Sequence, residues 1–292
     1  MTDIITGSTQ LVATKMDIIA AITQKELAFQ AKLMGAGVDY SAFAIKGAKQ
    51  VEIPKAGSFT VENRASGVAG TIAALTFATD AIPMDQRAFI SWLIDQNDAQ
   101  MSTVEVQSVY AQRAATAHAR AWDNRFNAVA LAAAVPVSGV TGDITLGKFL
   151  NLRSDLVSRD ADQRQMNFIC APDQYAKLLG DADVSRFINY GSGNALPSGV
   201  VPTLYGVNVI EHNGLSAGDY YMMDRDAIGY ATSLDPNIDS EKAVGLGTRS
   251  ELVAMDWLYG HTALFKGQRG VQATESALIV TKDETPAPPG PG

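Results

Sequence analysis

The chain has 292 residues, 47% of them hydrophobic, and a formal net charge of −8. With a mean hydropathy of +0.02, this composition is typical of a globular protein and excludes a disordered chain. No apolar run of about 20 residues occurs, so no membrane-spanning helix is expected. The acidic balance argues against sequence-specific reading of nucleic acid, which needs a basic surface.

Residues 1–7 lack the basic and apolar blocks of a secretory signal, so we expect none. A single cysteine, Cys170, excludes an intrachain disulfide and indicates a reducing compartment. Cys170 stands in the apolar run 167–171 (NFICA) and is expected to be a small buried core residue.

The residues that most often take part in catalysis are scattered along the sequence. The three histidines are far apart in the sequence: His118, His212 and His261. We expect His118 to face solvent or to pack, because no acid lies three or four residues away. HExxH, GxSxG and CxxC motifs are all missing. Asp95 and Asp98 are interpreted as helix-entry charges rather than as a catalytic pair. We therefore expect no enzyme activity, no cofactor and no metal.

The first predicted element is a helix at residues 14–34, preceded by a stretch with little periodicity. Gly35 and Gly37 are expected to end it, because glycine accommodates a left-handed cap. Its apolar side is irregular, so we interpret it as an N-terminal arm that needs a partner surface.

The next region has an extended character. Residues 50–59 predict strand, turn and strand, with Pro54 marking an edge. Residues 61–70 are polar and Gly-rich and predict a loop or hairpin tip, and strand-like residues resume at 71–78. Residues 82–94 are apolar on both parities, which predicts a strand covered on both faces. So long a hairpin is expected to touch something outside its own domain.

Residues 102–134 contain no Gly or Pro and are rich in Ala, which predicts one long helix. Ser102 or Thr103 is expected to cap its start, and Pro136 to end it. Its length would be roughly 50 Å, well beyond a typical helix. The apolar stripe expected to be buried consists of Val106, Tyr110, Ala114, Ala117, Ala121, Ala128 and Leu131. We interpret this helix as a structural backbone and not as part of an active site.

The second half predicts a mixed layer of helices and strands. Helices are expected at 146–157 and 172–179. Strands are expected at 165–171, 200–210, 220–223, 228–231, 251–265 and 278–280. The residues 224–227 (DRDA) predict a turn between two short strands.

Four stretches resemble the major capsid proteins of tailed bacteriophages, which share the Hong Kong 97 shell fold. Residues 95–134 are similar to the family's acidic entry into an Ala-rich spine helix. Residues 167–179 (NFICAPDQYAKLL) look like its strand that leads through Pro and an acid into a helix. Residues 204–215 (LYGVNVIEHNGL) are similar to a strand of its axial domain, and residues 50–94 match its extended loop in position and length.

The resemblance implies an α+β fold: an N-terminal arm, an extended loop, a spine helix in a peripheral domain and an α/β axial domain. In this sequence the expected parts are the arm (1–50), the extended loop with a peripheral-domain strand (51–100), the spine helix (101–135), the axial domain (136–235), the return strands of the peripheral domain (236–281) and a disordered tail (282–292).

The function implied is that of a major capsid protein, which self-assembles as hexamers and pentamers into an icosahedral shell around double-stranded phage DNA. Short-tailed phages are the expected closest relatives, the virion the expected location, and the host cytoplasm the place of assembly. The expected partners are further copies of the chain, a separate scaffolding protein, a portal protein and DNA held without sequence-specific binding. The candidate assembly contacts are Lys55, Glu62, Arg64, Arg87 and Trp92.

Two alternatives stay open at this stage. An encapsulin-like nanocompartment shell would have the same fold but hold a protein cargo. A soluble α/β enzyme with a long insertion at residues 50–94 would need a clustered catalytic site.

Overall fold

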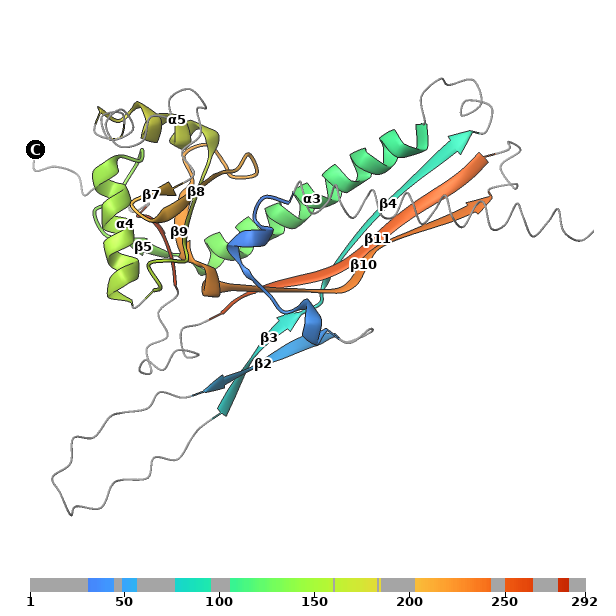
Figure 1. The fold of residues 1–292 in the computed structure, drawn as a ribbon, viewed down its shortest axis with the longest axis horizontal. Helices are drawn as coiled ribbons and strands as arrows, with labels where there is room; N and C mark the ends of the chain where they lie inside the picture. The colour runs from blue at the N-terminus through green and yellow to red at the C-terminus, as the bar shows by residue number, and fades with distance from the viewer. Residues whose placement is uncertain are drawn as a thin grey trace, which may run out of the picture.

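A computed structural model describes residues 31–44, 49–56, 77–95, 106–159, 161–182, 184, 203–242, 250–264 and 278–283. The α+β class is confirmed (Figure 1). The helices in this part are α3 (Val106–Ala133), α4 (Leu146–Ser158) and α5 (Pro172–Gly180). The strands are β1 (Val38–Asp39), β2 (Gln50–Ala56), β3 (Phe77–Pro83), β4 (Gln86–Asp95), β5 (Val135–Val137), β6 (Met166–Cys170), β7 (Thr203–Leu204), β8 (Val207–Glu211), β9 (Tyr220–Asp224), β10 (Ile228–Lys242), β11 (Ser250–Ala263) and β12 (Ile279–Lys282).

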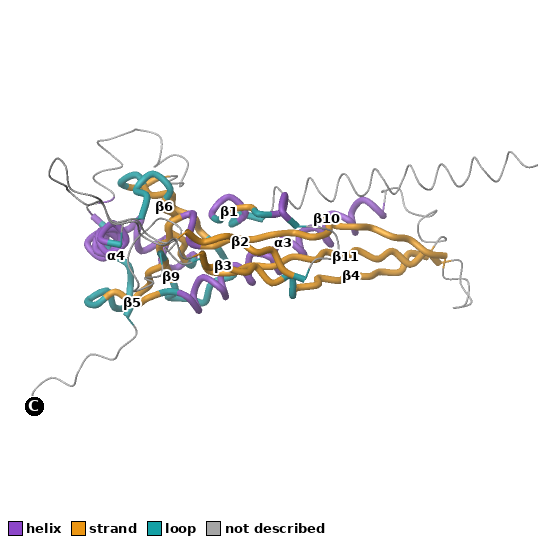
Figure 2. Tube along the Cα trace, turned by 90° about the horizontal axis from the view of Figure 1, so that it is seen from below, coloured by secondary structure: helices purple, strands orange, loops and turns teal. Residues whose placement is uncertain are grey.

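Three sheets organise the described residues. A six-stranded sheet has the order β5-β12-β9-β6-β8-β7, a four-stranded sheet the order β1-β10-β11-β4, and β2 pairs with β3 alone. Figure 1 shows the six-stranded sheet with α4 and α5 at one end of the molecule. The long strands β10, β11 and β4 run away from it beside α3, and the β2–β3 hairpin leaves them at an angle. Figure 2, turned by 90°, shows the long strands as one extended layer.

The long helix confirms its prediction in length but not in its buried face. It spans 28 residues, about 42 Å at 1.5 Å per residue. The predicted cap at Ser102 or Thr103 lies outside the described residues, whereas the helix ends at Ala133, before Pro136, as predicted. Of the predicted stripe, Ala114 is buried, whereas Tyr110, Ala117, Ala121 and Ala128 are exposed. The buried face lies further round the helix and consists of Ala111, Ala114, Ala115, His118, Ala119, Trp122, Asp123, Phe126, Asn127 and Ala130. The prediction failed because alanine fits either face.

Aromatic rings join α3 to the four-stranded sheet. Trp122 stacks on Phe126 at 5.6 Å between centroids and meets Tyr230 edge-on at 5.1 Å. The His261 ring lies 4.6 Å from Trp122, and both of its nitrogens lack a hydrogen-bond partner among the described residues. His118, which was expected to face solvent or to pack, packs edge-on near Trp257. Large buried rings of this kind supply much of a core's stability.

The six-stranded sheet forms where the sequence predicted regular elements. The Thr145 hydroxyl caps α4 by accepting from the Lys148 N–H. Strand β6 is buried at every position, as an apolar run in the middle of a sheet requires. Pro172 opens α5 at a position where its missing N–H costs nothing. The predictions for these three elements are confirmed to within two residues at each end.

Two strand predictions in this half were wrong in connectivity. Residues 203–211 form a hairpin, β7–β8, instead of one strand, because Tyr205 and Gly206 adopt φ values of 51° and 79° and so turn the chain tightly. Strands β9 and β10 do not pair with each other. β9 belongs to the six-stranded sheet and β10, 15 residues long, to the four-stranded sheet. The chain thus passes from the six-stranded to the four-stranded sheet at Arg225–Ala227. The predicted domain boundaries stay predictions.

The N-terminal part described here holds short elements. Met34–Ala36 form a 3₁₀ helix, and the rest of the predicted helix up to residue 30 lies outside the described residues. Gly37 follows it with φ of −113°, so the expected left-handed cap is not present. The glycine instead permits close packing, because a Cβ there would lie 3.0 Å from the Ile228 carbonyl oxygen and from the Phe126 ring.

The β2–β3 hairpin rests directly on the backbone of β11. Strand β2 continues through Pro54, and its single described partner β3 leaves it an edge strand on which proline is tolerated. The prediction that Pro54 marks an edge is therefore confirmed, and the turn expected at Gly57 lies outside the described residues. A Cβ at Gly260 would overlap the carbonyl oxygen of Pro83 at the end of β3. Val51, Ile53 and Ile82 of the hairpin belong to one apolar cluster with Ala231 and Leu264, which holds the hairpin against the four-stranded sheet.

We expect Gly260→Ala to destabilise the subunit by about 1–3 kcal/mol, because the added methyl group must push the end of β3 away. Gly147→Ala is the matched control, since a Cβ at Gly147 meets nothing within 4 Å. It should change stability by less than about 1 kcal/mol. Urea denaturation followed by circular dichroism measures both. Equal stability of the two variants would contradict the close contact.

Acid should destabilise the aromatic core through His261. Burial first and the Arg125 guanidinium second lower the pKa of His261 to about 3, and Asp85 opposes the shift. The unfolded chain binds this proton below about pH 6.5, so the stability present above that pH falls by about 1.4 kcal/mol per pH unit on acidification toward the folded-state value.

His261→Phe keeps a ring against Trp122 and removes the proton site. Its free energy of unfolding should therefore fall less steeply between about pH 6.5 and about pH 4.5, as measured by urea denaturation at several pH values. Some slope should persist, because burial also lowers the pKa of His118. Identical slopes for the two proteins would contradict this account.

Candidate assembly surface

Strand β4 forms one edge of the four-stranded sheet and pairs with β11 along its whole length, from Gln86 opposite Tyr259 to Asp95 opposite Ser250. Its side chains alternate. Those of Ala88, Ile90 and Trp92 face α3 and are partly buried, whereas those of the other parity are exposed: Arg87, Phe89, Ser91 and Leu93. The expected coverage on both faces is therefore wrong within this chain, because α3 covers one face.

The exposed face is apolar where a solvated strand would be polar. Phe89 is 59% exposed and Leu93 49% exposed. Leu252 lies opposite Leu93 on β11 and is 38% exposed. We call the residues Phe89, Leu93 and Leu252 the outer face. Large exposed apolar side chains on one strand face indicate a candidate site of protein association, and a long edge strand offers unpaired backbone groups beside it.

Arg87 adds a polar margin to the outer face. Its Nε donates to both carboxylate oxygens of Asp256, at 3.0 and 2.8 Å. The hydrogen bonds to Asp256 raise the pKa of Arg87 above its usual range. The Arg87 side chain is 72% exposed, so water screens the pair and its contribution to folding is small. The pair orients a guanidinium at the end of an apolar strip.

The structure places the predicted assembly contacts in three different settings. Arg87 lies beside the outer face. Trp92 lies on the opposite parity and packs against a cluster of Ala111, Ala114, Val253 and Met255, within its own subunit. Lys55 pairs with Ala78 in the β2–β3 hairpin, and Glu62 and Arg64 lie outside the described residues. Phe89 and Leu93 were missed, although they share a strand parity with the polar residues Arg87 and Ser91.

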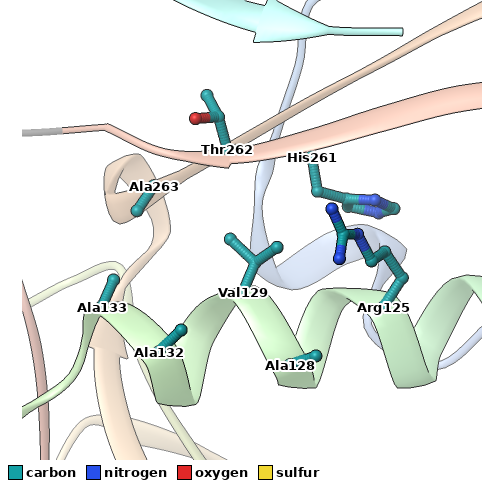
Figure 3. Close-up of a pocket in the computed structure, with 8 residues that line it drawn as sticks. All are labelled: Arg125, Ala128, Val129, Ala132, Ala133, His261, Thr262 and Ala263. Carbon is teal, nitrogen blue, oxygen red and sulfur yellow. The ribbon is translucent and has the colours of Figure 1, made fainter. Parts of the chain in front are cut away.

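A shallow pocket of about 470 Å³ opens between the end of α3 and the end of β11 (Figure 3). Small side chains form its helical side, where Ala128, Val129 and Ala132 line it. From β11, Ala263 lies on the helix side, whereas the Thr262 side chain points away from the helix. Arg125 stands beside His261 at one end. The Arg125 guanidinium is 3.4 Å from Asp85. The pocket has one titratable ring, the buried His261, and no nucleophile apart from the Thr262 hydroxyl.

Catalytic groups do not gather elsewhere in the described part. The prediction for Cys170 is confirmed: it is buried in the core, and burial first, then Glu211 and Asp173, raises the pKa of its thiol to about 12. Within the described ranges, no three metal-ligating side chains cluster. No helix described is both long and apolar enough to cross a bilayer.

A buried polar set was also missed by sequence reasoning. Asp123 and Asn127 of α3 meet His212, which follows β8, and Tyr221 of β9. Burial, with Asp123 as a second cause, raises the pKa of Tyr221 well above its usual value. The separation of 89 residues between Asp123 and His212 left no local pattern to detect. We call these four residues the polar junction.

No protein-family model matches the chain, and no curated protein sequence matches it significantly. Solved structures do match. A chain of Mycobacterium phage Che8 has a TM-score of 0.68 at 15% identity, over 86% of this chain and 90% of that one. The capsid of the Cyanophage P-SCSP1u matches with a TM-score of 0.63 at 15% identity, over 85% of this chain and 86% of that one. The mature capsid of bacteriophage PhiM1 gives 0.63 at 13% identity, over 88% and 87%.

The chain has the Hong Kong 97-like capsid fold. The fold expected from the resemblance is therefore confirmed, and the likeness extends over most of both chains. The assignment of α3 as the spine helix and of the β2–β3 hairpin as part of the extended loop stays a prediction.

Proposed function

We propose that the chain is a major capsid protein, which self-assembles as hexamers and pentamers into the icosahedral shell that encloses a phage's double-stranded DNA. The observation that carries this proposal is the fold, shared over most of the chain with chains from the capsids of P-SCSP1u and PhiM1. A closed shell built from one subunit needs heterologous contacts, in which different surfaces of neighbouring copies meet.

The described surface supports self-assembly. Phe89, Leu93 and Leu252 are large apolar side chains that the described part of the subunit leaves exposed. We propose a second copy of the chain as its partner, because shells bury such faces in large obligate interfaces. Arg87 remains a proposed contact beside this surface. Lys55, Glu62 and Arg64 remain proposed assembly contacts as well. For Trp92, which lies on the side of β4 that faces α3, we propose that its packing holds the outer face in position.

The finer features of the function are also part of the proposal. The net charge of −8 would keep an enclosed polyanion mobile, since like charges repel, so DNA would be held without sequence-specific binding. A separate scaffolding protein and a portal protein would assist assembly in the host cytoplasm, and the product would be the virion. A relationship to short-tailed phages stays a prediction.

Electron microscopy of the purified protein tests the proposal directly. We expect closed shells, or rings of five and six subunits when scaffold is lacking. Particles that carry nucleic acid after production in phage-infected cells would support a capsid, whereas particles filled with protein cargo would favour the nanocompartment alternative. A species of 31.0 kDa as the sole product, at every salt concentration and with scaffold present, would contradict both.

The double variant Phe89→Ser, Leu93→Ser should fold but fail to assemble. Both side chains are largely exposed in the subunit, so the free energy of unfolding should change by less than about 0.5 kcal/mol for each substitution. Sedimentation of the assembly products measures the loss of shells.

Leu150→Ser on α4 is the matched control, since Leu150 is 37% exposed and lies away from the outer face. It should reduce assembly less than the double variant does. Normal shells from the double variant would show that the outer face is not an interface.

A further inference from the structure

The polar junction begins with a buried carboxylate on α3. The side chain of Asp123 is 3% exposed. One oxygen, Oδ1, accepts from the Leu33 backbone N–H at 3.2 Å, and Oδ2 accepts from the Lys32 N–H at 3.2 Å. Oδ2 also lies 3.1 Å from Nε2 of His212. A charge this deeply buried is tolerated because three donors surround it.

The other side of His212 fixes its tautomer. Its Nδ1 lies 3.0 Å from the Gly214 backbone N–H, which can only donate, so Nδ1 acts as the acceptor. The ring proton therefore sits on Nε2 and points at Asp123. Asn127 also reaches Nδ1, with its Nδ2 at 3.0 Å, and its Oδ1 accepts from the Tyr221 hydroxyl at 2.7 Å. Every polar group in the chain of contacts thus has a defined direction.

These contacts join three parts of the fold. Lys32 and Leu33 belong to the N-terminal segment, Asp123 and Asn127 to α3, and His212 and Tyr221 to the six-stranded sheet. The helix itself is packed on the four-stranded sheet through Trp122, the residue next to Asp123. Hydrogen bonds therefore join α3 to the six-stranded sheet and to the N-terminal segment, and aromatic packing joins α3 to the four-stranded sheet.

Close approach at the junction depends on a glycine. A Cβ at Gly214 would overlap Oδ1 of Asn124 on α3 and would lie 2.7 Å from the His212 ring. The six-stranded sheet therefore cannot rotate relative to α3 unless hydrogen bonds of the polar junction break first. Breaking one would leave a buried carboxylate or imidazole unpaired, which is costly, so the arrangement is all or none instead of graded.

We propose that the polar junction is a lock that sets the angle between the two sheets and holds the N-terminal segment to it, and so determines the curvature of the assembled shell. The proposal rests on the proposed function for its consequence in the shell, but the lock itself is a property of the subunit. A closed shell contains many copies of the chain, so a small change of this angle in each subunit accumulates into a different particle.

Hydrogen exchange of the full-length protein tests the lock without reference to shells. His212→Phe alters the polar junction next to the six-stranded sheet. We expect the Lys32 and Leu33 amides, which lie in the N-terminal segment, to exchange at least tenfold faster than in the natural chain. Tyr221→Phe removes one hydroxyl and keeps the ring, and we expect a smaller acceleration in the same two amides. This milder variant keeps the test valid if His212→Phe does not fold.

Gln174→Met is the matched control. Gln174 is as deeply buried and accepts from the Ile144 N–H at 2.8 Å, but it lies beside the six-stranded sheet, away from the junction. It should lower stability and leave exchange at Lys32 and Leu33 unchanged relative to neighbouring amides. Unchanged exchange in both junction variants, or equal acceleration in Gln174→Met, would overturn the lock.

Electron microscopy then tests the consequence for curvature. We expect Asp123→Asn to give a broad range of particle diameters or open sheets where the natural chain gives one diameter, and Gln174→Met to keep that diameter. Shells of unchanged diameter from Asp123→Asn would overturn the link to curvature while leaving the proposed function intact. If the natural chain forms neither shells nor rings, even with scaffold present, the proposed function is contradicted, and the exchange experiment still decides the lock.

Discussion

The packing of α3 against β11 is the contact on which the positions of the other elements depend. Small side chains, including Ala111 and Ala114, let the first half of the helix approach Val253 and Met255 closely. In the second half, Trp122 and Phe126 replace alanine and fill the space under Tyr230 and the His261 ring. A helix that is thin at one end and bulky at the other settles into one register along the sheet, because a shift would force rings into alanine-sized gaps.

The same helix shows which features the sequence could predict and which it could not. Its length was predictable, since an unbroken stretch without Gly or Pro has few other stable forms. Its buried face was not, because alanine adds almost no amphipathic signal and because Asp123 and Asn127 are polar residues that are buried all the same. Buried polar groups are stable only with partners, and the partner His212 is distant in sequence.

Elements with a strong local signal were predicted correctly and connectivity was not. The Pro at the start of α5 and the unbroken apolar run of β6 fix those elements from within. No sequence pattern in residues 220–231 predicts that β9 and β10 belong to different sheets. Strand β4 is an instructive case, since its two apolar parities suggested burial on both faces. The structure covers one parity and leaves Phe89 and Leu93 open, so the sequence pattern is consistent with a partner outside the subunit.

The strand order of the six-stranded sheet has a consequence for the timing of synthesis. Strand β12 lies between β5 and β9, pairing parallel with the first and antiparallel with the second, yet it follows every other described element in the chain. A ribosome therefore exposes β5 and one edge of β9 long before it delivers the strand that joins them. Contacts so distant in sequence form slowly, and until residues 279–282 arrive the subunit cannot take its final shape. A nascent chain therefore completes the six-stranded sheet only after residues 279–282 have been synthesised.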